Sequence, residues 1–156
     1  MNNKPNIILV DHKFTIERSI ADVFAFLSNH ENYGLWFPEV LAVSPANDLP
    51  HGSVGKIYNE TLRLPTERNR QIAIEVVESE PPHLFVMEGQ FAPLHPRTEI
   101  RLTQKSAQET TVNWQFFSRS QSTIGRFLIN TFVKKAVVQQ SKTGLQRLKK
   151  HLETPT

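Results

Sequence analysis

The stretch from Ser122 to about Leu152 constrains the fold more than any other part of this sequence. It contains no proline, and its only glycines are Gly125 and Gly144. At a rise of about 1.5 Å per residue, a helix of this span is roughly 45 Å long. The average globular helix has only about 11–12 residues. The sequence therefore predicts one unusually long C-terminal helix, in which the two glycines could permit bending.

The apolar residues of this helix predict one broad buried face. They recur at spacings of three and four, which is typical of a helix that packs against another element. The face consists of Ile124, Leu128, Phe132 and Ala136, flanked by Ile129, Val133 and Val137, and then of Leu145, Leu148 and Leu152. Because no second long helix is predicted upstream, we expect a sheet to cover this face.

The preceding residues supply such a sheet. Alternating apolar and polar residues between turn signals predict seven strands. Their ranges are Ile7–Ser19, Val40–Ser44, Ser53–Leu64, Arg68–Glu80, His83–Phe91, Arg97–Gln104 and Glu109–Ser118. Short helices at Ile20–Leu27 and His30–Leu35 separate the first two strands. One-sided alternation is typical of an antiparallel sheet with one wet face, and its twist will curl it round the helix. The prediction is an α+β fold in which residues 1–156 form one domain.

Composition narrows the possible functions. The chain has no cysteine, which excludes disulfides, thiolate catalysis and cysteine-ligated metals. Its six histidines show neither helical i, i+4 pairs nor a zinc-protease pattern, so no metal site is predicted. The sequence lacks a glycine-rich phosphate loop, a dinucleotide fingerprint and a nucleophile elbow, and no cofactor is predicted.

The charge distribution bears on partners and location. The net charge is +3, and much of the surplus lies on the predicted long helix. A solvated helix face accounts for it, and weak contact with an anionic membrane is the alternative. Phe116, Phe117 and Arg119 are too isolated a pattern to predict nucleic-acid binding. Because the sequence has neither a signal-peptide run nor an apolar segment long enough to span a bilayer, we predict a cytoplasmic protein.

Several short motifs occur in a characteristic order. The segment Ser19–Leu27 precedes Tyr33–Pro38, Gly52–Gly55 has the form G-x-x-G, and Val76–Leu84 has the form V-x-E-x-x-P-P-x-L. Together with the predicted element order, they resemble the helix-grip fold of the START-like (SRPBCC) superfamily, of the polyketide cyclase/dehydrase and lipid-transfer type. Ser19 or Ile20 stands where that family commonly has proline. The resemblance covers about residues 14–152 and implies a cavity between sheet and helix for an apolar or amphipathic ligand, but no particular reaction.

The resemblance and the apolar pattern together indicate which residues would line such a cavity. Trp36 and Phe37 follow the second short helix, where the family has its cavity mouth. The other expected wall residues are Phe85, Met87 and Phe91 on the fifth strand, Trp114 and Phe116 on the last strand, and Leu128 and Phe132 on the long helix. A filled core explains the large aromatic residues equally well.

Catalysis would need polar groups inside that apolar space, because burial shifts their pKa values. Tyr58 and Glu60 share one strand face, and Arg70 lies on the next strand. An aldol cyclisation needs a base and an oxyanion donor that converge, which makes Glu60 with Tyr58 or Arg70 the candidate set. Three functions follow from the sequence. The first is binding, and possibly transport, of a lipid, polyketide or isoprenoid, and the second is a polyketide cyclase/dehydratase-like activity in the same cavity. The third, suggested by the basic long helix, is that of a quinone or lipid chaperone that docks on a membrane.

Overall fold

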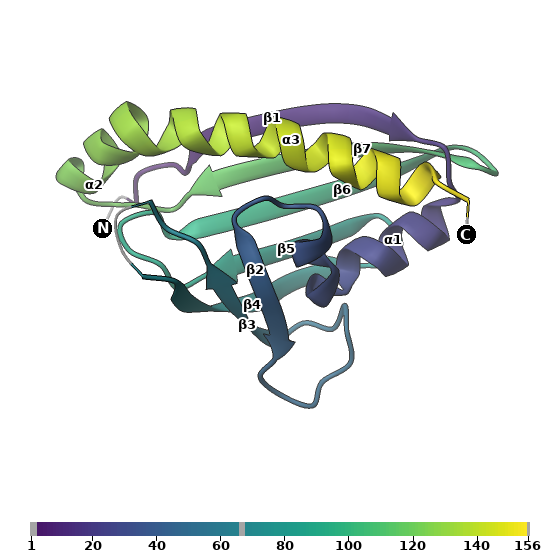
Figure 1. Cartoon of the computed structure of the whole chain (residues 1–156), viewed down its shortest axis with the longest axis horizontal. Helices are drawn as coiled ribbons and strands as arrows, with labels where there is room; N and C mark the ends of the chain where they lie inside the picture. The colour runs from purple at the N-terminus through teal and green to yellow at the C-terminus, as the bar shows by residue number, and fades with distance from the viewer. Residues whose placement is uncertain (1–2, 66–67, 156) are drawn as a thin grey trace.

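The computed structural model describes residues 3–65 and 68–155. Seven strands form one antiparallel sheet in the order β1-β7-β6-β5-β4-β3-β2 (Figure 1). The strands are β1 (Ile7–Ile16), β2 (Val40–Pro45), β3 (Ile57–Leu62), β4 (Arg70–Glu80), β5 (Leu84–Gly89), β6 (Pro96–Ser106) and β7 (Glu109–Ser118). The third strand begins later than predicted because Gly52 and Gly55 adopt φ angles of +81° and +90°, which belong to turns rather than to a strand.

Two short helices connect the first two strands, as predicted. The α-helix α1 (Ile20–Ser28) begins after Ser19, whose side chain accepts a hydrogen bond from the Asp22 amide. The 3₁₀ helix η1 (His30–Leu35) begins after Asn29, whose side chain accepts from the Glu31 amide. One local side-chain cap therefore fixes the start of each helix.

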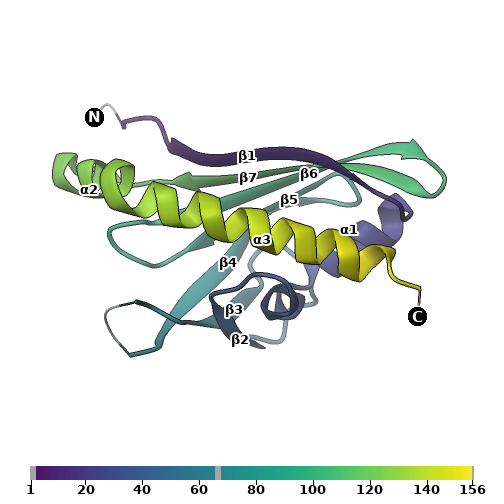
Figure 2. The same cartoon turned by 45° about the horizontal axis from the view of Figure 1, so that its top comes forward.

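The long C-terminal helix runs the length of the sheet in both views, with α1 near its C-terminal end (Figures 1 and 2). It consists of α2 (Thr123–Leu128), a π-helical turn η2 (Ile129–Val133) and α3 (Lys134–Glu153). This arrangement confirms the predicted helix-grip fold. No helix among the described residues is long and apolar enough to cross a membrane.

In the first half of this helix, the predicted apolar face is centred one residue away from the buried row. Gly125, Ile129, Val137 and Ser141 are buried, with Val133 half-buried between them. The predicted row of Ile124, Leu128, Phe132 and Ala136 is exposed instead. One residue corresponds to a rotation of about 100° round the helix. The flanking members Ile129, Val133 and Val137 of the predicted face do belong to the buried row, whereas Gly125 and Ser141 give no apolar signal. Leu145, Leu148 and Leu152 are buried as predicted.

Gly144 has a different role from the predicted bending. A Cβ atom at this position would lie 3.2 Å from Cδ2 of Phe37 and 3.4 Å from Cε3 of Trp36. The missing side chain therefore permits α3 to approach the residues that follow η1. The irregular part of the helix is η2, which contains no glycine.

Candidate ligand cavity

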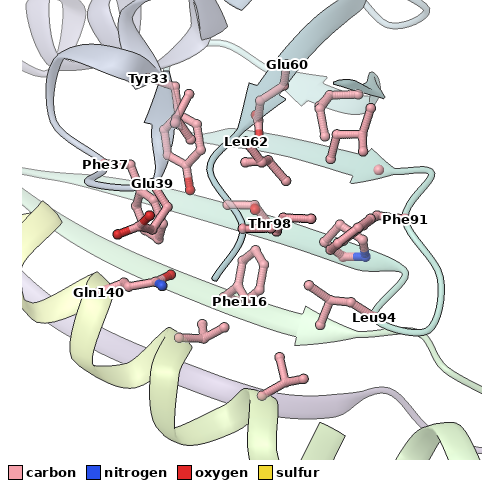
Figure 3. Close-up of a pocket in the computed structure, with 18 of the residues that line it drawn as sticks. Tyr33, Phe37, Glu39, Glu60, Leu62, Phe91, Leu94, Thr98, Phe116 and Gln140 are labelled. Carbon is pink, nitrogen blue, oxygen red and sulfur yellow. The ribbon is translucent and has the colours of Figure 1, made fainter. Parts of the chain in front are cut away.

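A cavity of about 370 Å³ lies between the concave face of the sheet, η1 and α3 (Figure 3). This volume is within the usual range of about 300–1,000 Å³ for small-molecule sites. Most of its wall is apolar, with Leu62, Ile72, Ile74, Met87, Phe91, Leu94, Phe116 and Val133 among the lining residues. Strand alternation brings Leu62, Ile72, Ile74, Met87 and Phe116 to one face of the sheet. Phe91 and Leu94 come from the β5–β6 connection, and Val133 comes from η2.

The cavity mouth is marked by the lining residues that are also exposed to solvent. These are Arg63 and Pro65 after β3, Pro93 between β5 and β6, and Phe132 and Ala136 on the long helix. The opening is therefore bordered by two strand connections and by the junction of η2 with α3.

The most unusual feature of the cavity wall is a buried histidine–glutamate pair. His30 is the first residue of η1, and Glu60 faces inward from β3. The distance from Nε2 of His30 to Oε2 of Glu60 is 2.5 Å, and the two side chains are only 3% and 7% exposed. Burying an ionisable group is costly unless it is paired, so each side chain compensates the other. The pair is held in the cavity wall by a helix cap and by strand alternation.

Tyr33 stands beside this pair. It lies three residues after His30 in η1, and the two rings stack with centroids 4.7 Å apart. Burial of the phenol, and secondarily the nearby Glu60 carboxylate, raises the pKa of Tyr33 well above its ordinary value. The hydroxyl therefore stays protonated at neutral pH and is able to donate a hydrogen bond. Tyr33 and Glu60 enter the cavity from the same side (Figure 3).

The cavity is polar at one end and apolar at the other. Tyr33, Glu39 and Gln140 lie together at one end, whereas Phe91 and Leu94 lie at the other (Figure 3). The described residues contain no group of three or more histidine, aspartate or glutamate side chains that could hold a metal ion. The shape and polarity of the cavity suit an elongated molecule with one polar end.

A family profile described as polyketide cyclase/dehydrase and lipid transport matches residues 8–153. The chain belongs to this family. The match spans nearly the whole sequence and confirms the resemblance to the START-like superfamily. A comparison with curated proteins gives no match.

Several solved structures share this fold. The KanY protein is 14% identical with a TM-score of 0.70, and the alignment covers 97% of this chain and 100% of KanY. A protein from Deinococcus radiodurans is 16% identical with a TM-score of 0.67, over 92% and 96% of the two chains. The di-domain ARO/CYC protein BexL, from the BE-7585A biosynthetic pathway, is 16% identical with a TM-score of 0.65, over 95% of this chain and 52% of BexL. At these identities the likeness establishes the fold alone.

In this family member, five of the predicted wall residues line the cavity: Phe37, Met87, Phe91, Phe116 and Phe132. The other four lie elsewhere. Trp36 and Trp114 pack edge to face at 6.4 Å and border a void of only about 10 Å³, and Phe85 packs against Phe24 of α1. Leu128 is 38% exposed on the outer side of α2. The tryptophans and Phe85 thus belong to the packed core, because α1 and η1 cover that end of the sheet.

Of the predicted catalytic set, only Glu60 lines the cavity. The Tyr58 hydroxyl lies 2.7 Å from Nδ1 of His51, outside the cavity wall. The Arg70 guanidinium lies 5.2 Å from the centre of the Phe91 ring, and Arg70 pairs in register with Leu62 rather than with Glu60. The cavity lining therefore contains Glu60 but neither Tyr58 nor Arg70.

His30 and Tyr33, which lie beside Glu60, were not among the predicted site residues. Their i, i+3 spacing on a predicted short helix was the one available signal, because it places both on one face. That spacing does not indicate which strand the face will meet.

Proposed function

We propose that this protein binds an amphipathic small molecule in the cavity, with its apolar body between the sheet and the long helix. The observation that carries this proposal is the cavity of about 370 Å³, whose wall is mostly apolar and has Tyr33, Glu39 and Gln140 together at one end. Transfer of an apolar body from water to such a wall is favourable, and a few placed polar groups fix its orientation. Transport of the ligand, in the cytoplasm, is the corresponding biological role.

The polar end suggests what kind of head group the ligand carries. The protonated phenol of Tyr33 can donate to a carbonyl oxygen, and Glu60 can accept from a hydroxyl group. The ligand class that fits is therefore an apolar molecule with a ketone, quinone or phenol group, as found in polyketides and isoprenoids.

A substitution at the cavity mouth tests the binding proposal. Ala136→Trp places an indole on an exposed position that borders the opening, so it should obstruct entry without disturbing the core. We expect the fluorescent apolar probe N-phenyl-1-naphthylamine to bind the variant at least about tenfold more weakly than the wild-type protein. The matched control is Gln139→Trp, since Gln139 is exposed on the same helix but does not line the cavity.

Titration of probe fluorescence measures both affinities. Equal affinities of the two variants, or absence of probe binding to the wild-type protein together with a ligand-free native mass spectrum, would contradict the proposal.

The buried His30–Glu60 pair favours a second candidate function, a cyclase/dehydratase-like activity. Glu60 would remove a proton from the carbon next to a ligand carbonyl, and the negative charge would move to the carbonyl oxygen. Tyr33 would donate a hydrogen bond to that oxygen as charge develops. His30, which pairs with Glu60 through Nε2, would hold the carboxylate in position. The resulting enolate could then attack a second carbonyl of the same molecule.

Deuterium exchange tests this second candidate. The wild-type protein should accelerate the incorporation of solvent deuterium into the methyl group of 2-acetylnaphthalene, and Glu60→Gln should lower that rate by about 100-fold. Glu39→Gln is the matched control, because Glu39 is another carboxylate of the same cavity but is absent from the pair. Nuclear magnetic resonance follows the exchange. Equal loss in both variants, or no catalysis by the wild-type protein, would leave binding as the function.

A further inference from the structure

The outer side of α2 and η2 exposes a cluster of large apolar side chains. Ile124, Phe127, Leu128 and Phe132 are 76%, 63%, 38% and 66% exposed. They occur within nine consecutive residues of one helix, so they form a patch rather than scattered surface positions. An exposed apolar patch of this kind usually marks a site of contact with a partner or a membrane. We refer to these four residues as the apolar tip.

The apolar tip is continuous with the cavity mouth. Phe132 belongs to both, since it is exposed and lines the cavity. Pro65 and Pro93, which are also exposed, border the opening from two strand connections. In both views the β5–β6 connection lies at the same end of the molecule as α2, opposite α1 (Figures 1 and 2). A surface that covered the apolar tip would therefore also face the opening.

The charge next to the apolar tip is positive. The sequence contains no aspartate or glutamate between Glu109 and Glu153. Lys134 and Lys135 directly follow the tip and are exposed, and within the described ranges neither lysine forms an ion pair. Arg63 adds an exposed cation at the mouth. A partner that covers this surface must accept apolar side chains and supply negative charge.

We propose that this surface docks onto an anionic lipid bilayer, with the apolar tip in the headgroup region and Lys134 and Lys135 at the lipid phosphates. Aromatic and aliphatic side chains on one side of a helix, with lysines beside them, are the features of helices that lie in the membrane interface. The bilayer satisfies the apolar and the charge requirement at once. Docking presents the cavity mouth to the membrane, so the ligand would enter the cavity from the lipid. This statement about the ligand rests on the proposed binding function.

Vesicle sedimentation tests the docking. The wild-type protein should bind phosphatidylcholine vesicles that contain about 30 mol% phosphatidylglycerol, more weakly in about 0.5 M than in about 0.1 M salt. The double variant Ile124→Ser/Phe127→Ser should bind these vesicles at least about tenfold more weakly than the wild-type protein. Lys134→Gln/Lys135→Gln should bind these vesicles roughly 30-fold more weakly, since each lysine near an anionic surface increases the affinity about fivefold. None of these four residues lines the cavity.

Matched controls distinguish the patch from general surface properties. Val54→Ser removes an apolar side chain that is 58% exposed elsewhere, and Lys142→Gln removes an exposed cation further along α3; both should bind vesicles like the wild-type protein. Absence of wild-type binding at low salt, or unchanged binding of either double variant, would overturn the proposal. A dimer that Ile124→Ser/Phe127→Ser dissociates, without vesicle binding, would assign the surface to a second copy instead.

The probe titration separates this proposal from the proposed function. Both double variants should bind N-phenyl-1-naphthylamine in solution as tightly as the wild-type protein does. Probe binding without vesicle binding would overturn the docking alone, and vesicle binding without probe binding would overturn the cavity function alone.

Discussion

Replacement of His30 by leucine is expected to lower the free energy of unfolding by about 3–5 kcal/mol. The substitution leaves the Glu60 carboxylate, which is 7% exposed, without the imidazole 2.5 Å away. A buried charge that loses its partner keeps the full cost of its removal from water. Urea denaturation followed by circular dichroism measures the change.

A double-mutant cycle gives this prediction its control. Glu60→Leu alone should also destabilise the protein, because it leaves His30 buried without its acceptor. The double variant His30→Leu/Glu60→Leu should be within about 2 kcal/mol of the wild-type protein, since two apolar side chains can replace a buried pair at little cost. If the two single losses of stability simply add in the double variant, His30 and Glu60 do not stabilise each other, which would contradict this prediction.

Replacement of Trp114 by alanine is expected to lower the free energy of unfolding by about 3–5 kcal/mol. Trp114 is fully buried on β7, packs edge to face with Trp36 and stacks on Phe116. Its removal leaves space that the surrounding strands and η1 cannot fill. Because the sequence contains only two tryptophans, circular dichroism is a better measure of unfolding here than intrinsic fluorescence.

The conservative variant separates packing from hydrogen bonding at Trp114. Its Nε1 atom is buried and has no hydrogen-bond partner among the described residues, so Trp114→Phe removes no such bond and should cost less than about 2 kcal/mol. The surface control Phe127→Ala should change stability by no more than about 0.5 kcal/mol, because Phe127 is 63% exposed. If Trp114→Phe and Trp114→Ala lowered the free energy of unfolding by similar amounts, the phenylalanine ring would restore none of the lost packing. That result would contradict the prediction.

The fold was predictable because its signals are local. Strand alternation and the three-and-four spacing of apolar residues in helices each act within a few residues, and the order of the elements is sufficient to indicate a helix-grip fold. Which side of the long helix faces the sheet was harder to predict. Its sheet-facing row includes Gly125 and Ser141, which are buried through close packing and not through hydrophobicity. An apolar pattern therefore centred the predicted face on the neighbouring row that contains Ile124 and Phe132.

The polar part of the cavity depends on contacts between distant residues. The inward position of Glu60 follows from its strand, but its partner His30 lies 30 residues away on a short helix. Whether η1 covers β3 or another strand is decided by how the whole sheet curls, which no local pattern encodes. The same holds for Trp36 and Trp114, which the apolar pattern could not assign to the core or to the cavity wall.

The position of β1 in the sheet determines when the protein can complete its fold. β1 is an edge strand whose only neighbour is β7, with Ile7 opposite Ser118. During synthesis β1 therefore stays unpaired until all six later strands, β7 included, have left the ribosome. Such long-range pairing slows folding and leaves an exposed strand edge in the nascent chain. The long helix follows all seven strands in the sequence, so the ligand space cannot form before this helix has been synthesised.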